Sequence, residues 1–172
     1  GSVDGDAVSV RIAVVDEAIQ IFPRIYDEER RRRPGMLSRS EKWWKHLFHD
    51  PRRGRKGFSS LRLALAETAG IGDGYAIYRQ KAEWETGFPN GTVSVREVIA
   101  PTAAAHTTLW RFLSSIDLFP QIKYWNLPVD DALRWTVPDL RRVTRRRGAA
   151  LHLRIRDVVR ALEARPSSAG GR

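Results

Sequence analysis

Two glutamates flank a tryptophan near the middle of the chain, in the order Glu83-Trp84-Glu85. The trio follows a segment of strand character and stands beside Gly87, so we place it at the end of a strand. Carboxylates pair with ammonium groups and an indole offers its π-face to a cation, so these residues could receive a cationic amine or sugar substrate. The alternative is an exposed loop with one packing tryptophan. We predict substrate-binding roles for Glu83, Trp84 and Glu85.

A second place for chemistry is the predicted junction between a strand, residues 92–100, and a helix that begins after Pro101. Backbone N–H groups at a helix start can bind phosphates, and glycines let the ligand approach them. Here the junction reads Pro101-Thr102-Ala103-Ala104-Ala105-His106-Thr107, and no glycine occurs from residue 92 to residue 147. The triple alanine can still start a helix and offer N–H groups, but the glycines that would let a phosphate approach are missing. We therefore predict that this chain binds no cofactor.

The histidines are His46, His49, His106 and His152. His46 and His49 are three residues apart on a predicted helix, a spacing that could hold a metal ion, but no third ligand is evident. We predict no metal site. His106 could act as a base, although a solvent-facing side chain is the simpler interpretation.

Three tyrosines, Tyr75, Tyr78 and Tyr124, could each act as an acid. The sequence contains no Ser/His/Asp pattern, P-loop or dinucleotide fingerprint. Glu97 stands in a strand between apolar neighbours, where we expect a structural pair with Arg79 or Arg96. Asp130 and Asp131 most simply start a helix. We predict no catalytic residue in this chain.

The composition is that of a folded domain. The chain has 172 residues, 42% of them hydrophobic, and no cysteine, which excludes disulfides, thiolate zinc sites and cysteine nucleophiles. It has no run of ~18 apolar residues that would span a membrane, and we expect a cytoplasmic location. We expect a tag or disordered start at residues 1–6, one domain at 7–165 and a flexible tail at 166–172. Because the only methionine is Met36, we expect a fragment of a longer protein.

The charge is strongly basic, +10 from 30 lysines and arginines against 20 acidic residues. Such a charge suits a nucleic acid or another anionic partner. It also suits a domain from an arginine-rich proteome. The arginines fall in separate clusters without a known nucleic-acid motif, so nucleic-acid binding is kept only as an alternative.

Hydrophobic periodicity predicts the element order β-α-α-β-β-β-α-β-(α)-β-α, which favours a mixed α/β sheet with flanking helices. Asp16 is expected to cap the first helix, which Pro23 kinks or divides, and Ser38 to cap the second through a capping box with Glu41. Asp73-Gly74 is a hairpin signal between the next two strands. The predicted strands are 8–14, 61–66, 75–85, 92–100, 121–125 and 151–155, and the predicted helices are 16–32, 38–50, 102–116, 130–138 and 157–162.

Tryptophans mark core and surface on these elements. Trp43 and Trp44 are adjacent on a helix, so one of them should be core and the other could face another domain. Trp125 and Trp135 are expected to pack rather than to bind a ligand.

Several segments, in this order, resemble the second domain of the Eis (enhanced intracellular survival) family of acetyltransferases, over about residues 22–164. The most specific is Arg33-Pro34-Gly35-Met36-Leu37-Ser38-Arg39. The others are Phe22-Pro23-Arg24-Ile25-Tyr26-Asp27, Trp43-Trp44, Gly74-Tyr75-Ala76-Ile77-Tyr78-Arg79, Val95-Arg96-Glu97, Leu109-Trp110-Arg111-Phe112-Leu113 and Pro128-Val129-Asp130-Asp131.

The resemblance implies a single GNAT-like domain from a three-part actinobacterial parent. In such a parent, a first GNAT domain binds acetyl-CoA and holds a catalytic tyrosine, and a third, sterol-carrier-like domain supplies a C-terminal carboxylate as base. Family members look like hexamers and acetylate amines, notably aminoglycosides. The second domain has lost its CoA loop, which agrees with the glycine-free junction, and helps to wall the substrate cavity. Arg172 is therefore not expected to be the catalytic C-terminus.

Three functional hypotheses follow. The first is a non-catalytic GNAT-like domain that forms part of the substrate cavity and oligomer contacts of an Eis-like N-acetyltransferase, next to flanking GNAT and sterol-carrier-like domains. The second is an active, stand-alone GNAT acetyltransferase, which would have to bind acetyl-CoA. The third is a basic nucleic-acid-binding module, whose affinity would fall steeply with salt.

Overall fold

The computed structural model describes residues 7–148 and 155–164. These fall into two compact units, one ending at Val137 and the other starting at Pro138. The predicted last strand lies mostly outside the described residues, as do residues 1–6 and 166–172, and the predicted domain bounds stay a prediction.

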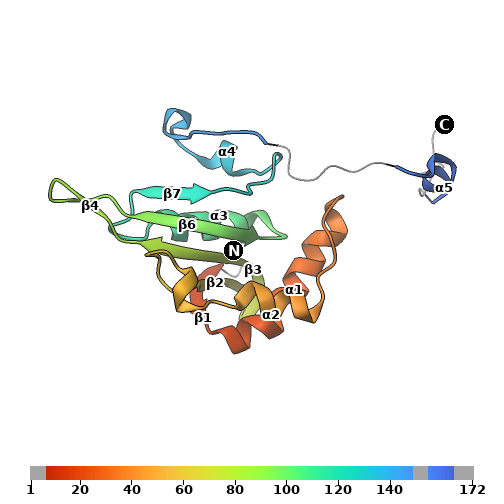
Figure 1. Ribbon diagram of the computed structural model, residues 1–172, viewed down its shortest axis with the longest axis horizontal. Coiled ribbons are helices and arrows are strands. Elements are labelled where there is room, and N and C mark those ends of the chain that lie inside the picture. The colour runs from red at the N-terminus through yellow and green to blue at the C-terminus, as the bar shows by residue number, and fades with distance from the viewer. Residues whose placement is uncertain (1–6, 149–154, 165–172) are drawn as a thin grey trace, which may run out of the picture. The chain divides into compact units, whose positions relative to one another are not determined.

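The first unit is a five-stranded sheet with helices on both faces (Figure 1). The strand order is β1-β2-β3-β6-β7, with antiparallel pairs except for the parallel pair β6–β7. This confirms the predicted class, an α/β fold with a mixed, mostly antiparallel sheet flanked by helices. The elements of this unit are β1 (Ser9–Ala13), α1 (Val15–Arg32), α2 (Glu41–Phe48), the 3-10 turn η1 (Arg52–Gly54), β2 (Arg62–Thr68), β3 (Ile71–Lys81), β4 (Trp84–Glu85), β5 (Phe88–Pro89), β6 (Thr92–Ile99), α3 (Ala103–Ser114), β7 (Gln121–Tyr124) and α4 (Leu133–Thr136).

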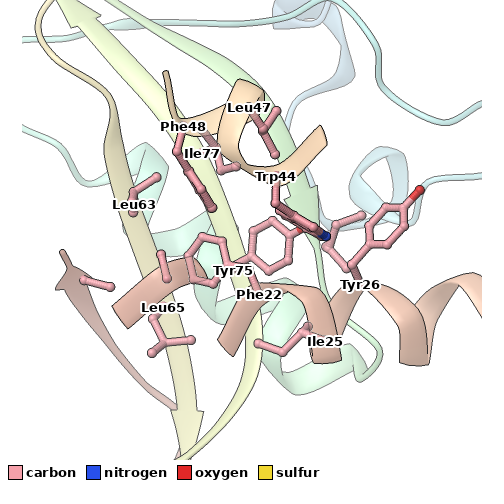
Figure 2. Packing of buried hydrophobic residues seen from close by; sticks show 13 residues of the cluster. Phe22, Ile25, Tyr26, Trp44, Leu47, Phe48, Leu63, Leu65, Tyr75 and Ile77 are labelled. Atoms are coloured by element: carbon pink, nitrogen blue, oxygen red, sulfur yellow. The ribbon is translucent and has the colours of Figure 1, made fainter. Parts of the chain in front are cut away.

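Helices α1 and α2 cover one face of the sheet with an aromatic core. The Phe22 ring of α1 stacks on the Tyr75 ring of β3, with centroids 4.1 Å apart (Figure 2). Trp44 and Phe48 of α2 pack beside them, while Trp43 is 52% exposed. This confirms the prediction that one tryptophan of the adjacent pair belongs to the core. Apolar side chains spaced for one helix face therefore bury the large residues of this cluster.

Helix α3 covers the opposite face, which small residues line. Ala64, Ala66 and Ala76 of the central strands are fully buried there, beneath Leu109 and Leu113. A Cβ atom on Gly74 would lie 3.1 Å from the Ala105 Cβ and 3.2 Å from the Ile99 carbonyl oxygen. Small side chains thus let α3 start close against β3.

Two predicted helix starts are wrong by a few residues. The N-cap of α1 is Val14 without a side-chain hydrogen bond, and Asp16 lies inside the first turn, because β1 runs directly into the helix. The cap of α2 is Ser40, whose hydroxyl accepts the Trp43 N–H, and not Ser38. Arg39 is extended away to reach β6, so α2 begins only after it. Helix α1 also continues through Pro23, so it is not divided there.

The predicted hairpin turn at Asp73-Gly74 is also displaced. Ala69 and Gly70, with φ of 50° and 77°, form the turn, a conformation typical of two-residue hairpins. Asp73 and Gly74 lie inside β3 instead. The Asp73 carboxylate reaches Thr102, the cap residue of α3, and the Cβ position of Gly74 lies against Ala105 of α3.

The second unit contains the 3-10 turn η2 (Leu140–Arg142) and the short helix α5 (Val158–Glu163) among its described residues. Asp157 caps α5 by accepting the Arg160 N–H at 3.0 Å, as predicted. In the described parts of both units, no helix is long and apolar enough to cross a membrane.

Candidate functional site

The junction of β6 and α3 is built as the sequence predicts, with Thr102 as the cap of α3. The Thr102 Oγ1 accepts the Ala105 N–H at 3.2 Å and donates to Asp73 Oδ2 at 2.8 Å. Asp73 also accepts the Thr68 hydroxyl at 3.3 Å. A carboxylate therefore lies at the positive end of α3, where a phosphate would otherwise find its favourable partner.

Thr102→Ala should lower the free energy of unfolding by about 1–2 kcal/mol, because both the Ala105 N–H and the Asp73 carboxylate lose a partner. Urea unfolding of the variant measures this loss. Thr107→Ala, inside the same helix, is the matched control and should change stability by less than about 0.5 kcal/mol. Equal effects of the two substitutions would contradict the capping role.

A second carboxylate lies against the first turns of α3. Asp131 Oδ1 is 3.1 Å from His106 Nε2 and accepts the Leu133 N–H at 2.8 Å. Helix α4 begins at Leu133 with Ala132 as its N-cap, so the predicted start at Asp130 is early by a few residues. The His106 side chain is only 15% exposed, so the predicted solvent-facing position is wrong. Trp110 Nε1 also points at His106 Nε2, at 3.2 Å. The imidazole nitrogen can donate to Asp131 or accept from Trp110, so the two contacts compete for it.

The pKa of Asp131 reflects these contacts. Burial raises it, but hydrogen bonds from His106 and the Leu133 N–H, with the charge of Arg33, bring it below its ordinary value of 3.8. The stabilisation by ionised Asp131 is therefore complete above the unfolded pKa and disappears as the pH falls through the folded pKa.

Asp131→Asn should accordingly be less stable than the wild type by about 1–2 kcal/mol at pH 6, since a charge-assisted hydrogen bond is lost. The difference should shrink as the pH falls below about 4. Thermal unfolding of both proteins from pH 2.5 to pH 6 measures this dependence. A difference that is constant over this range would show that the carboxylate charge is not the cause.

A β-bulge in β6 lies next to the last residue that pairs with β7. The β3–β6 register shifts so that Ile77 pairs with Glu97 and Tyr78 with Val95, leaving Arg96 as the extra residue. The β6–β7 pairing extends from Thr92 to Val95. Bulges of this kind bend a strand and often border functional sites. The β6–β7 pairing therefore stops next to the bulge, where β7 itself ends at Tyr124.

Tyr124, the last residue of β7, contacts β6 beyond the bulge. Its hydroxyl oxygen accepts the Val98 N–H at 3.2 Å, so a donor on the free edge of β6 is already in use. Burial raises the pKa of Tyr124 to about 12. Burial likewise raises the pKa of Tyr75 and of Tyr78, and the Tyr75 hydroxyl donates to Glu97 Oε1 at 2.6 Å. At neutral pH these three phenols are therefore protonated. The Tyr75 and Tyr124 hydroxyls make structural hydrogen bonds, and Tyr78 is buried.

The sequence suggested that Glu97 pairs with Arg79 or Arg96, but the structure shows a different partner. Its partner is Arg39, 58 residues earlier, which donates to both carboxylate oxygens. Arg79 instead donates to Asp50 Oδ1 at 2.6 Å. Arg96, displaced by the bulge, donates to the Leu47 carbonyl at 3.0 Å. A structural role for Glu97 agrees with these contacts.

The predicted substrate residues lie on a separate small hairpin of β4 and β5, which extends from the sheet at the left of Figure 1. Trp84 is 65% exposed, and a neighbouring aromatic, Phe88, is also exposed. Glu83 pairs with Lys81, whose hydrogen bond lowers the pKa of Glu83. Glu85 accepts the Asn90 side-chain amide at 2.7 Å. The trio is therefore together and accessible, but each carboxylate already has a partner.

Among the described residues, no group of three or more histidine, aspartate or glutamate side chains is placed so that it could hold a metal ion. His46 lies exposed on α2, and His49, the C-cap residue of that helix, is also exposed. The site residue that sequence reasoning missed is Asp73, which was hidden in the Gly-Asp-Gly run of a supposed turn. Its distance of 29 residues from Thr102 leaves no local signal of their contact.

The chain is similar in sequence to known acetyltransferases. The protein-family model of the acetyltransferase (GNAT) domain matches residues 35–156 of this chain. An uncharacterized N-acetyltransferase of Streptomyces avermitilis is 39% identical over 160 residues, which are 93% of this chain and 39% of the relative. N-acetyltransferase Eis of Mycobacterium tuberculosis is 35% identical over 162 residues, 91% of this chain and 37% of that protein. The chain therefore spans about two fifths of the length of these relatives.

Solved structures share the fold. A GCN5-related N-acetyltransferase of Anabaena variabilis superimposes with a TM-score of 0.58 and 20% identity, over 78% of this chain and 32% of that one. Eis1 of Mycobacterium abscessus gives a TM-score of 0.57 and 23% identity, over 82% and 33%. In both cases the likeness covers about a third of the longer chain.

Proposed function

Because this chain belongs to the GNAT family of acetyltransferase domains, we propose that it is the non-catalytic second domain of an Eis-like N-acetyltransferase. Its roles would be to scaffold the parent, to form one wall of the amine-substrate cavity and to contribute oligomer contacts. The parent would transfer an acetyl group from acetyl-CoA to a primary amine, such as one on an aminoglycoside. Flanking GNAT and sterol-carrier-like domains would hold the cofactor and the catalytic groups.

The observation that carries this proposal is the carboxylate at the start of α3. GNAT acetyltransferases use acetyl-CoA, whose phosphates are anionic, whereas Asp73 is bonded to the cap residue Thr102 at that helix end. Asp131 adds a second carboxylate one turn later. Together with the missing glycines, these groups do not fit a pyrophosphate at this junction. We therefore assign no cofactor and no reaction step to this chain.

Exposed aromatic surface supports the idea of flanking domains. Trp125 and Trp135, expected to pack, are 87% and 76% exposed, and Val129 between them is 70% exposed. The sequence expectation for these tryptophans is therefore wrong. Large apolar side chains at a surface often mark an interface. In the proposed parent they would contact other domains or subunits.

The cavity-wall role of the β4–β5 hairpin has a direct test with an aminoglycoside such as kanamycin. Titration calorimetry of the protein should show weak binding, which the double substitution Glu83→Gln and Glu85→Gln weakens about threefold or more by removing exposed charges. Glu41→Gln, on the exposed surface of α2, is the control and should leave the affinity unchanged. Identical affinities in all three proteins would remove the hairpin from the proposed cavity.

An acetyl-transfer assay of the chain with acetyl-CoA and the same aminoglycoside tests the non-catalytic assignment. The expected result is no acetylated product above the rate of the protein-free reaction. Steady turnover would instead make this chain an active GNAT enzyme in its own right.

A further inference from the structure

Arg39 lies in a cage of side chains suited to a guanidinium group. Its Nη1 donates to Glu97 Oε1 at 2.9 Å and its Nη2 donates to Glu97 Oε2. The Arg39 Cζ lies 3.8 Å from the centroid of the Tyr26 ring and 5.1 Å from that of Trp44. A forked carboxylate contact combined with aromatic faces is the arrangement by which proteins recognise a planar guanidinium.

The walls of this cage belong to regular elements. Tyr26 comes from α1, Trp44 from α2, Tyr75 from β3 and Glu97 from β6. Tyr26, Trp44 and Tyr75 are buried in the aromatic core (Figure 2), and Tyr75 fixes the Glu97 carboxylate with a hydrogen bond of 2.6 Å. The walls are therefore held by contacts that do not depend on Arg39.

The occupant of the cage, in contrast, comes from the connecting segment between α1 and α2, residues 33–40, which we call the strap. The strap backbone makes few hydrogen bonds to the described residues around it; the Tyr26 hydroxyl donates to the Leu37 carbonyl at 2.8 Å. The Leu37 side chain is 64% exposed. Arg39 thus holds the strap together with Met36, which packs against the aromatic core, and Arg33, which pairs with Glu29.

We propose that the cage is a binding site for a guanidinium group, that Arg39 of the same chain closes it, and that it takes an arginine-like small molecule when Arg39 withdraws. The site should prefer guanidinium over ammonium. Two parallel N–H groups match the two Glu97 oxygens and the planar group stacks on Tyr26, whereas an ammonium offers only a point charge. This inference does not depend on the proposed function.

The experiment removes the internal occupant and compares two matched ligands. Agmatine and putrescine share a four-carbon diamine frame and differ in one guanidinium group. In Arg39→Ala, calorimetry should show agmatine binding at least about tenfold tighter than putrescine. The wild type should bind agmatine at least about 100-fold more weakly, because Arg39 competes as an intramolecular ligand at a high effective concentration.

A second variant locates the site. Arg39→Ala combined with Glu97→Gln should lose the preference for agmatine, since the forked contact is gone. Equal agmatine affinity in wild type and Arg39→Ala, or equal affinity for both ligands in Arg39→Ala, would overturn the proposal. If Arg39→Ala does not fold alone, refolding with agmatine but not with putrescine would support it, and failure with both would overturn it.

Discussion

Phe22→Ala is expected to lower the free energy of unfolding by about 3–5 kcal/mol, the cost typical of a large aromatic removed from a packed core. Phe22 is fully buried and stacks on Tyr75, with Phe48 at 5.9 Å on its edge. Its removal would leave a cavity between α1, α2 and the sheet, because these walls are regular elements that relax only partly. Urea unfolding monitored by tryptophan fluorescence measures the loss.

The matched control for this substitution is Phe88→Ala on the β4–β5 hairpin. Phe88 is 74% exposed, so its replacement should change stability by less than about 0.5 kcal/mol. If Phe22→Ala costs less than about 1 kcal/mol, or no more than Phe88→Ala, the aromatic cluster is not the core that holds the two helices to the sheet.

Glu97→Gln is expected to cost about 3 kcal/mol, because it leaves the Arg39 guanidinium among aromatic rings without its counter-ion. Both side chains are only 14% exposed, so water does not replace the lost partner well. The substitution also weakens the bond that the Tyr75 hydroxyl donates to this carboxylate. Chemical unfolding at neutral pH provides the measurement.

Two comparisons make this prediction specific. Glu41→Gln breaks the exposed pair with Lys45 and should cost no more than about 0.5 kcal/mol. Arg39→Met combined with Glu97→Gln removes both charges and should be more stable than Glu97→Gln alone. A Glu97→Gln cost as small as that of Glu41→Gln would mean that the buried pair does not bear on stability.

The sequence predicted best where the signal is local. The Thr102 cap, the Asp157 cap and the α3 helix follow from residues three or four positions apart, and the structure confirms them. The α2 start was displaced because Arg39, two residues before the helix, is held by a partner in β6. Local rules favour Ser38 as the cap, but the distant ion pair decides.

The candidate site illustrates the same limit more strongly. The absence of glycine at the β6–α3 junction was visible in the sequence, whereas the carboxylate of Asp73 at that junction was not. Asp73 reaches Thr102 only because β3 packs beneath α3, and Gly74 permits that approach. The partner of Glu97 was missed for a similar reason, since a contact across 58 residues leaves no periodic pattern.

Titration of acetyl-CoA into the protein, followed by calorimetry and by the thermal unfolding temperature, tests whether this chain lacks a cofactor site. We expect no saturable heat and no shift in unfolding temperature up to millimolar acetyl-CoA, because the Asp73 carboxylate and the glycine-free turn do not accept the pyrophosphate. Saturable binding at micromolar concentration, with a matching rise in unfolding temperature, would contradict it.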